Sequence, residues 1–478
     1  MRPACRLFSI VLISVALSAC AAVREPDVRL PAKFEAPAAV PDGVIALDRW
    51  WTTYGDPELT RLIEQALVAN PDARSAAARL REARATRASA LLQTLPTGRA
   101  AVSKNRTDTK QLSGTAINIP GYSTSGVSTT EAANFNVSWD IDIFGRTFAA
   151  DRALKGDVAA ARFNYEAARA GLAAQVADAY FQARGLAIQL EDARETARIE
   201  QSLFDTATRR AAVGIAASSD ADRVAGDLAQ AQAQAAALES QLQTERRTLL
   251  VLAGRTSEPT ANLKSQTAPL VGQAPQVPAT IPSTLLGRRP DVREAQARIA
   301  SAAGRRDVAA LALLPTFTLT PGLGWAKSTQ PGFTSTTQNW SLGYGVTQPI
   351  LALPHLLADL KASDARTEQA VIAYEKAVQT AFAEAESALV QLASDRRRVA
   401  LLTDGEARAR RGYQASRIGY DRGLSDLQTS LAAEQSWRTT RSQLTAAQVQ
   451  ALRRSVQAYK ALGGGWPAEQ FSPQTQAR

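Results

Sequence analysis

The chain is 478 residues long and carries a net charge of +10. Its 55 lysines and arginines are spread among 45 aspartates and glutamates in helical segments, whereas a nucleic-acid surface needs clustered basic residues. His355 is the single histidine, and no G-x-x-x-x-G-K loop is present. These absences argue against a histidine-based metal cluster, a histidine-dependent catalytic triad and an ATP site. We therefore expect no nucleic-acid partner, metal, cofactor or enzymatic activity.

The amino-terminal residues have the pattern of a bacterial export signal. Arg2 and Arg6 precede an apolar run over residues 7–17, which is too short to cross a bilayer. The run leads into Leu-Ser-Ala-Cys, which resembles a lipobox, so we predict that residues 1–19 are removed and that Cys20 becomes acylated. A chance cysteine behind an ordinary signal is the alternative. A lone thiol in an oxidising compartment favours acylation, and the acyl chains would hold the protein to a membrane.

The residues after Cys20 favour the outer membrane and a flexible connection to it. Alanines follow the cysteine, where lipoproteins retained at the inner membrane commonly have aspartate. We interpret residues 20–48 as a lipidated leash. No later segment has 18 consecutive apolar residues, so the sequence predicts no transmembrane helix.

The remainder of the chain reads as two copies of one unit. Asn70-Pro71-Asp72 and Leu95-Pro96-Thr97 recur 219 residues later as Arg289-Pro290-Asp291 and Leu314-Pro315-Thr316. In each copy the first proline suits the start of a helix and the second its end. We predict a first repeat over 49–256, a proline-rich connector over 257–284, a second repeat over 285–466 and a tail over 467–478.

Each repeat contains a very long helical segment. The segments run from about Arg146 to Val213 and from about His355 to Arg422, and the first has apolar residues at the alternating three- and four-residue spacing of a coiled coil. A helix of this length spans on the order of 100 Å, so it cannot wrap a compact core. An ordinary bundle of short helices is the alternative.

Each repeat also contains a pair of strands with one apolar face. Residues 134–143 and 340–348 alternate apolar and polar side chains, and we pair them with strands over 97–106 and 316–325. Pro321 suggests an edge, a bulge or a strand end. Four strands cannot close a barrel, and an open edge in a membrane leaves backbone groups unpaired, so several chains would have to associate. Trp139, Trp325 and Trp340 would be interfacial anchors. A soluble β cap is the alternative.

These features together resemble the outer membrane factors of tripartite efflux and secretion systems, the TolC-like channels, and their NodT-type lipoprotein branch. The most specific segments are Leu-Ser-Ala-Cys, DRWWTTYGDPEL at 48–59, NFNVSWDIDIFGR at 134–146 and IPSTLLGRRPDVREAQARI at 281–299. The resemblance implies a mainly α protein with a small transmembrane β part. Duplicated long coiled-coil helices would form an α-barrel, and four strands per protomer would contribute to a trimeric 12-stranded β-barrel.

The resemblance also implies a location and partners. The protein would be a passive homotrimeric outer membrane channel of an RND-type efflux system, with a periplasmic adaptor, an inner-membrane transporter and outer membrane lipid as partners. The alternatives are the outer membrane component of a type I secretion system, or a non-channel periplasmic lipoprotein that acts as an adaptor or scaffold.

The periplasmic tip would be the regulated part, where the long helices turn at Gly214 and Gly423. Glycine permits the left-handed conformation that ends a helix, and Ser218 or Ser219 and Ser425 are expected to cap the helices that follow. Helix caps and surface ion pairs are the simplest interpretation of the polar residues here. In a trimeric channel, copies from three chains could instead latch a closed tip. The gate candidates are Asp220, Asp222, Arg417, Tyr420, Asp421, Arg422 and Asp426.

Overall fold

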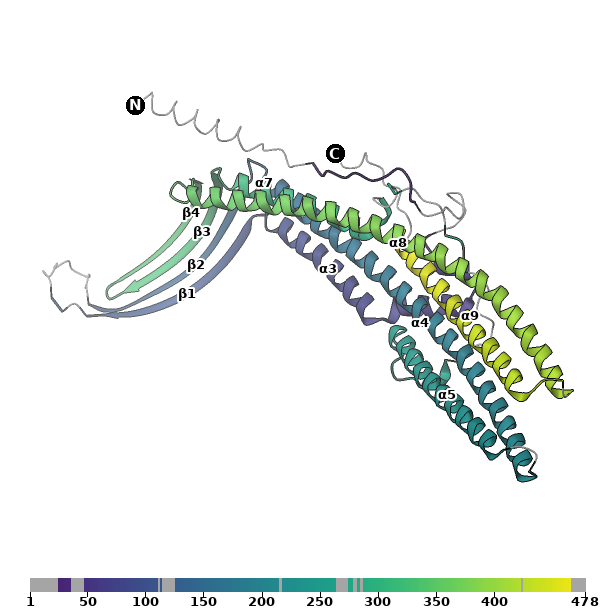
Figure 1. Ribbon diagram of the computed structural model, residues 1–478. Coiled ribbons are helices and arrows are strands. Elements are labelled where there is room, and N and C mark those ends of the chain that lie inside the picture. Colours follow the sequence, from purple (N-terminus) through teal and green to yellow (C-terminus); the bar gives the residue numbers. More distant parts are fainter. Residues whose placement is uncertain are drawn as a thin grey trace. The chain divides into compact units, whose positions relative to one another are not determined.

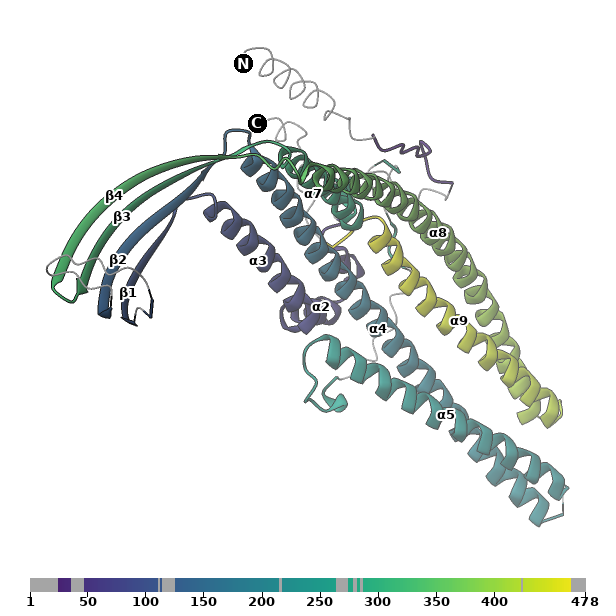
Figure 2. The ribbon, with the colours of Figure 1, turned by 90° about the vertical axis from the view of Figure 1, so that its left-hand side faces the viewer.

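The computed structural model describes most of the chain as two compact units (Figures 1 and 2). The described residues are 25–35, 47–110, 112–113, 125–214, 217–263, 274–277, 282–283, 287–422 and 424–465. The predicted signal, Cys20, Gly423 and the predicted tail lie outside them. The sheet unit comprises Met1–Pro26, Arg81–Ala160 and Gln296–Ala373, and the helical unit comprises Asp27–Leu80, Ala161–Ala295 and Tyr374–Arg478.

The order of the elements repeats once along the chain, and corresponding helices have matching lengths. Helices α3 and α7 have 22 residues each, α5 and α9 have 35 each, and α4 and α8 have 67 and 69. Each half therefore contributes a helix, two strands and a long helical hairpin. The elements are η1 (Trp50–Tyr54), α2 (Pro57–Ala69), α3 (Pro71–Leu92), β1 (Thr97–Thr109), β2 (Gly126–Ile141), α4 (Arg146–Ala212), α5 (Ser218–Leu252), η2 (Thr260–Asn262), α7 (Pro290–Leu311), β3 (Thr316–Gln330), β4 (Phe333–Thr347), α8 (Leu353–Asp421) and α9 (Leu427–Ala461).

The four strands form one antiparallel sheet in the order β1-β2-β3-β4 (Figure 1). The strands have 13, 16, 15 and 15 residues, so they extend further toward the connecting loops than the nine or ten residues predicted for each. The extensions are rich in threonine and serine, which suit a strand but lack the apolar alternation by which the strands were predicted. At the other end β2 stops at Ile141, because Asp142 accepts hydrogen bonds from the backbone N–H groups of Arg146 and Thr147 at the start of α4.

The expectation that Pro321 marks an edge, a bulge or a strand end is wrong. Strand β3 continues through Pro321, which pairs with Leu342 of β4. The register between β2 and β3 is the same on both sides of Pro321. Val137 and Ser138 of β2, however, have no paired residue on β3. Proline has no N–H group to donate, so the ladder toward β2 is interrupted without a change of register.

Within the sheet unit, α4 and α7 approach closely at two glycines. A Cβ atom on Gly156 would lie 2.5 Å from the backbone nitrogen of Ser301, and one on Gly304 would lie 2.5 Å from that of Ala153. Side chains at these positions would force the helices apart, because such distances are far below van der Waals contact. Polar contacts join α7 to both long helices: Ser301 donates to Asp157 of α4, and Arg306 donates to Asp364 of α8.

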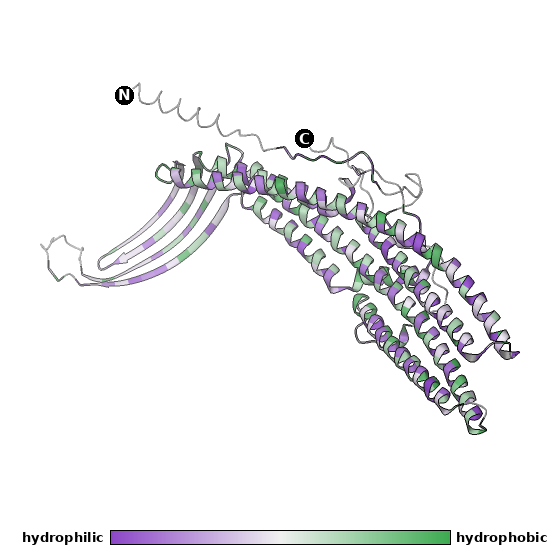
Figure 3. Cartoon of the chain, viewed as in Figure 1, coloured by the Kyte–Doolittle hydropathy of each residue, from purple (hydrophilic) through white to green (hydrophobic). Residues whose placement is uncertain are grey.

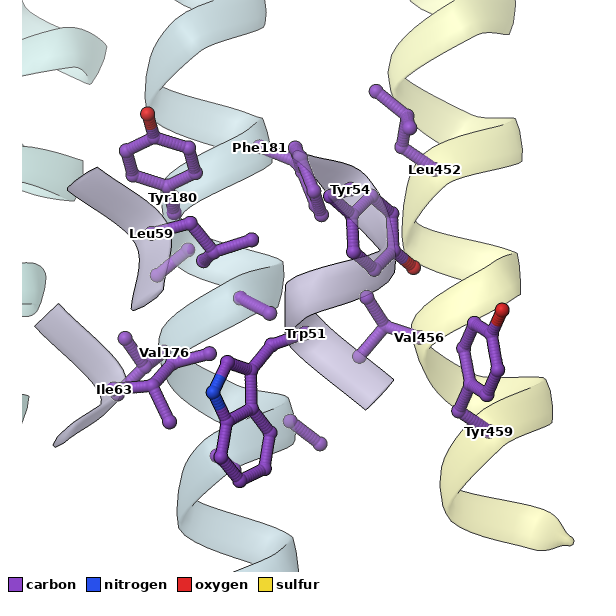
Figure 4. Packing of buried hydrophobic residues seen from close by; sticks show 14 of the residues in the cluster. Trp51, Tyr54, Leu59, Ile63, Val176, Tyr180, Phe181, Leu452, Val456 and Tyr459 are labelled. Atoms are coloured by element: carbon purple, nitrogen blue, oxygen red, sulfur yellow. The ribbon is translucent and has the colours of Figure 1, made fainter. Parts of the chain in front are cut away.

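The helical unit has its own hydrophobic core (Figure 4). Trp50 and Tyr54 of η1 pack between α4 and α9, where Trp50 stacks on Tyr459 at 5.6 Å and Tyr54 contacts Phe181 at 4.9 Å. The Tyr54 and Ser455 hydroxyls share a buried hydrogen bond of 2.6 Å. The aromatic residues of the DRWWTTYGDPEL segment are therefore core residues that join the amino-terminal segment to both helical hairpins.

A buried ion pair lies beside this core. Asp56 caps α2 by accepting from the backbone N–H groups of Glu58 and Leu59, and its other carboxylate oxygen accepts from Arg184 at 2.6 Å and from the Tyr180 hydroxyl at 2.8 Å. The Asp56 and Arg184 side chains are 11% and 9% exposed. One carboxylate thus starts a helix and neutralises a buried guanidinium on another.

Among the described helices, none combines the length and the apolar character required to cross a membrane. Figure 3 shows hydrophobic and hydrophilic residues mixed along each long helix. The same view shows mixed hydropathy along the strands, which reflects the two different faces of the sheet.

Candidate functional site

One face of the sheet, which we name the outer face, carries apolar side chains in successive rows across the strands. Paired rows run Ile141–Phe317–Val346, Trp139–Leu319–Tyr344 and Phe135–Leu323–Trp340, and another contains Ala133 and Trp325. Between the second and third of these, Pro321 pairs with Leu342, and the common register places Val137 opposite Pro321 although the two are not paired. The band extends about 27 Å along the strands, at 3.3 to 3.4 Å per residue. Many of these side chains are exposed in the single chain: Trp340 is 78% and Tyr344 88% exposed. A band of this extent matches the apolar belt of a membrane-spanning sheet.

The opposite, inner face carries small and polar side chains. Its rows include Asn134–Gly324–Asn339 and Asn136–Gly322–Ser341. The glycines make room for their neighbours, since a Cβ atom on Gly324 would lie 2.3 Å from the Asn339 side-chain oxygen. A sheet that is apolar on one side and polar on the other fits a position between lipid and water.

Both edges of the sheet are open in the described part of the chain. Strand β1 pairs only with β2, and β4 pairs only with β3. The outer edges of β1 and β4 therefore present backbone N–H and C=O groups without a strand partner. Such groups cannot be left unpaired in the apolar part of a membrane.

The three predicted anchor tryptophans all lie on the outer face. Trp325 is in the row nearest the connecting loops, Trp139 is one row from the helices, and Trp340 lies opposite Leu323 within the band. The sequence pattern therefore identified the face correctly, because alternation fixes which side of a strand a residue occupies.

The far ends of the helical hairpins contain the predicted tip residues. Gly214 follows α4 with a φ of 73°, a left-handed conformation that favours glycine. The predicted serine caps are wrong: α5 begins after Ala217 without a side-chain cap, and Asp426 rather than Ser425 caps α9 by accepting from Thr429 N at 2.6 Å. Ser425 instead donates to the carbonyl oxygen of Ser416. Aspartate in the capping position also interacts favourably with the positive end of the helix dipole.

Three gate candidates, Tyr420, Arg417 and Asp426, make side-chain contacts at the tip. The Tyr420 hydroxyl accepts a hydrogen bond of 2.9 Å from Arg210, which joins the end of α8 to the end of α4. Arg417 donates to the Tyr413 hydroxyl at 3.4 Å. Hydrogen bonds from the Thr429 side chain and backbone lower the pKa of Asp426, so this carboxylate stays charged to a lower pH than usual.

The other tip residues are not brought together within one chain. Asp220 is half-buried and Asp222 is exposed near the start of α5, and neither carboxylate has a hydrogen-bond or ion-pair partner in the described part. Arg422 is exposed after α8, and the Asp421 side chain and Gly423 lie outside the described residues. Within the described part of the chain, the hydrogen bond between Arg210 and Tyr420 bridges the ends of the two hairpins.

Sequence reasoning missed Glu200, a half-buried glutamate of α4. Burial, and then the neighbouring carboxylates of Glu434 and Asp227, raise the pKa of Glu200 despite the nearby Arg438. One oxygen of Glu200 has no hydrogen-bond partner among the described residues, while Arg438 donates to Glu434 at 2.5 Å.

Sequence reasoning also missed Arg210, although the adjacent arginines Arg209 and Arg210, shortly before Gly214, were a usable signal. Over the same described residues, no cluster of three potential metal ligands is found.

Comparison with known proteins identifies the family. The model of the family described as outer membrane efflux protein matches residues 62–255 and 281–464. The chain belongs to this family. The resemblance to the outer membrane factors is thereby confirmed, and the lipoprotein branch stays a prediction.

Individual relatives cover nearly the whole chain. The pyoverdine export outer membrane protein OpmQ of Pseudomonas putida is 30% identical over 460 residues, which is 96% of this chain and 97% of the relative. The cation efflux system protein CusC of Escherichia coli is 29% identical over 87% of this chain and 88% of the relative.

Solved structures have the same fold. The outer-membrane channel OprN matches with a TM-score of 0.79 at 26% identity, over 93% of this chain and all of that chain. The open-state outer membrane channel MtrE of Neisseria gonorrhoeae matches with a TM-score of 0.80 at 25% identity, over 94% of this chain and 98% of that chain. The mainly α fold class with long duplicated helices and four strands per chain is confirmed, as are the outer membrane location and the function as an efflux channel.

Proposed function

We propose that three copies of this chain form the passive outer membrane channel of an RND-type tripartite efflux system. The four-stranded sheet, with two open edges, an apolar face and a polar face, carries the proposal. Three such sheets would join edge to edge into a 12-stranded barrel that leaves no edge unpaired and encloses a polar lumen. The division into two repeats, with the bounds predicted from sequence, belongs to the same proposal.

The long helices would continue the conduit through the periplasm. At 1.5 Å per residue, α4 and α8 each measure about 100 Å. A periplasmic adaptor and an inner-membrane transporter would supply the substrate and the energy, because the channel itself carries out no chemical step. Acylated Cys20 would tether the protein to outer membrane lipid. The relatives named above are export and efflux proteins, which favours efflux over protein secretion.

The assembly is tested by labelling adjacent residues on the two faces. In outer membranes, Leu342→Cys should react with a lipid-soluble maleimide and resist a water-soluble one, whereas Ser341→Cys should react with the water-soluble reagent. Purified protein in planar bilayers should conduct ions. Equal access of the water-soluble reagent to both positions, together with no conductance, would refute the proposal.

We further propose that the tip residues hold the channel closed. Asp220, Asp222, Arg417, Arg422 and Asp426 lie near the ends of the two hairpins, where symmetry in a trimer would bring copies from different chains near the axis. Asp421 and Gly423 belong to the same turn in the sequence. The Arg210–Tyr420 hydrogen bond supports this interpretation, because it couples the two hairpins of one chain.

Single-channel recordings test the latch. Tyr420→Phe removes the acceptor for Arg210 while keeping the ring, and it should raise the open probability, as should Asp426→Ala and Asp421→Ala. Arg198→Ala is the control, because Arg198 makes its ion pairs with Glu191 and Glu195 of the same helix. An unchanged closed state in all three tip variants would exclude the latch.

A further inference from the structure

The charged residues on the outer face of the sheet are confined to the end nearest the connecting loops. Lys104, Glu131 and Lys327 lie opposite one another on β1, β2 and β3, one row beyond the row of Ala133 and Trp325. Arg106 lies in the next row, and Asp108 follows it on the same face of β1. None of the five apolar rows toward the helices contains a charged residue.

The charges in these rows do not cancel. Lys104 and Glu131 form an ion pair of 2.7 Å. Lys327 and Arg106 are exposed and have no ion-pair partner in the described part of the chain, whereas one further carboxylate, that of Asp108, lies nearby. Each chain therefore presents one net positive charge here.

Hydroxyl groups surround these cations. Thr336 lies opposite Lys327, and the row of Arg106 continues through three threonines on β2, β3 and β4. This region, named the basic border, comprises Lys104, Arg106, Lys327, Thr129, Thr329, Thr334 and Thr336. It offers ammonium, guanidinium and hydroxyl donors directly beside an apolar surface.

We propose that the basic border binds phosphate groups of lipid headgroups in the leaflet next to the strand-connecting loops. This proposal rests on the proposed function, in which the outer face contacts lipid. Acyl chains would cover the apolar rows, and the headgroup phosphate would then lie at the level of the first charged row. Lysine and arginine donate charge-assisted hydrogen bonds to phosphate, and their long stems can follow the apolar surface to reach it. Trp325, two residues from Lys327 on the same face, would lie at the same interface.

Fluorescence quenching by brominated lipids tests the proposal with the full-length protein in bilayers. Dibrominated phosphatidylcholine and dibrominated phosphatidic acid are titrated separately, and the ratio of their apparent affinities is measured. Trp139, Trp325 and Trp340 report contact with lipid, while the tryptophans outside the four strands, Trp50, Trp51, Trp437 and Trp466, give a constant background. We expect a preference of about fivefold for phosphatidic acid, since one basic side chain near an anionic surface contributes about that factor.

Two variants at the basic border are expected to change the preference for phosphatidic acid in opposite directions. Lys104→Gln/Arg106→Gln/Lys327→Gln leaves only the carboxylates of Glu131 and Asp108 here and should reduce the preference to one or below, and Glu131→Gln should raise it. Lys361→Gln, at an exposed position of α8, should leave it unchanged. An unaltered preference in the triple variant would overturn the proposal.

Two further outcomes distinguish a failure of the basic border from a failure of the proposed function. Normal quenching by phosphatidylcholine without a preference would overturn the basic border alone, whereas no quenching by either lipid would overturn the membrane position of the sheet as well. Loss of the preference with inorganic phosphate, but not with sodium chloride of equal ionic strength, would show that the free anion competes for the same donors and would support recognition of the phosphate group. Equal loss with both salts would show general charge attraction and contradict a phosphate site.

Discussion

The two units of the chain use their aromatic residues in opposite ways. In the helical unit Trp50 and Phe181 are fully buried, whereas in the sheet Trp340 and Tyr344 are among the most exposed side chains. The helical unit has a core within one chain. The sheet has an exposed apolar surface and no core. Lipid must therefore cover its apolar face, and strands of other chains must pair with the backbone groups at its edges. Apolar residues thus stabilise the fold in one unit and create an external interface in the other.

The largest expected effect comes from placing a charge on the outer face. Leu342→Arg should prevent stable insertion, because an arginine at the middle of a lipid-facing strand costs about 2 to 4 kcal/mol in each chain. Ser341→Arg, one residue away on the inner face, is the matched control and should still assemble. Heat-modifiable oligomer bands from outer membranes measure the difference. Comparable loss of oligomer in both variants would contradict the assignment of the faces.

The next largest effect is expected in the helical unit. Asp56→Ala removes the cap of α2 and leaves Arg184 buried without its carboxylate, so the free energy of unfolding should fall by about 3 to 5 kcal/mol. Tryptophan fluorescence during urea unfolding measures this change. The double variant Asp56→Ala/Arg184→Met should recover part of the loss, because it also removes the buried guanidinium that has lost this carboxylate.

Glu64→Ala is the matched control for Asp56→Ala. Glu64 pairs with Arg49 at the surface, where an ion pair contributes at most about 1 kcal/mol. Equal losses at Asp56 and Glu64 would show that the buried network does not stabilise the helical unit.

The smallest effect should depend on pH. The pKa of Glu200 is raised above its ordinary value of 4.5, so the folded state binds this proton more tightly than the unfolded chain does. Stability should therefore fall as the pH rises from about 4.5 through the raised pKa, and Glu200→Gln should remove that loss. The Tm of the variant should exceed that of the original chain at pH 8, and the difference should shrink toward pH 4.

Glu195→Gln, at an exposed position of the same helix, is the control and should show no comparable dependence on pH. A Glu200→Gln variant with a lower Tm at pH 8 would mean that the charged carboxylate stabilises the helical unit, which is the opposite of what its burial predicts.

Local patterns predicted much of this fold. The starts of α3 and α7 at Pro71 and Pro290 follow from proline chemistry, and the outer face follows from the alternation around Trp139 and Trp340. The full strand lengths could not be predicted, because threonine-rich segments beyond the apolar band show no hydrophobic period. The break in the β2–β3 pairing opposite Pro321 could not be predicted either, because it depends on the register between strands from the two halves of the chain.

The candidate site was predictable only in part. Gly214 could be assigned to a turn because it is a glycine. The choice of Asp426 over Ser425 as the cap of α9, in contrast, depends on where the turn places each side chain. The adjacent arginines before Gly214 could have marked Arg210 as a candidate, but no local pattern indicates that Tyr420 is its partner or that the pKa of Glu200 is raised, because both arise from helices distant in sequence. The basic border likewise appears only when the strands are paired.

The mass of the detergent-extracted complex tests the requirement for association most directly. Native mass spectrometry of the full-length protein should show complexes of three chains that persist in mild detergent. A stable, folded single chain as the sole species, with its sheet residues freely open to water-soluble labels, would contradict the trimeric channel.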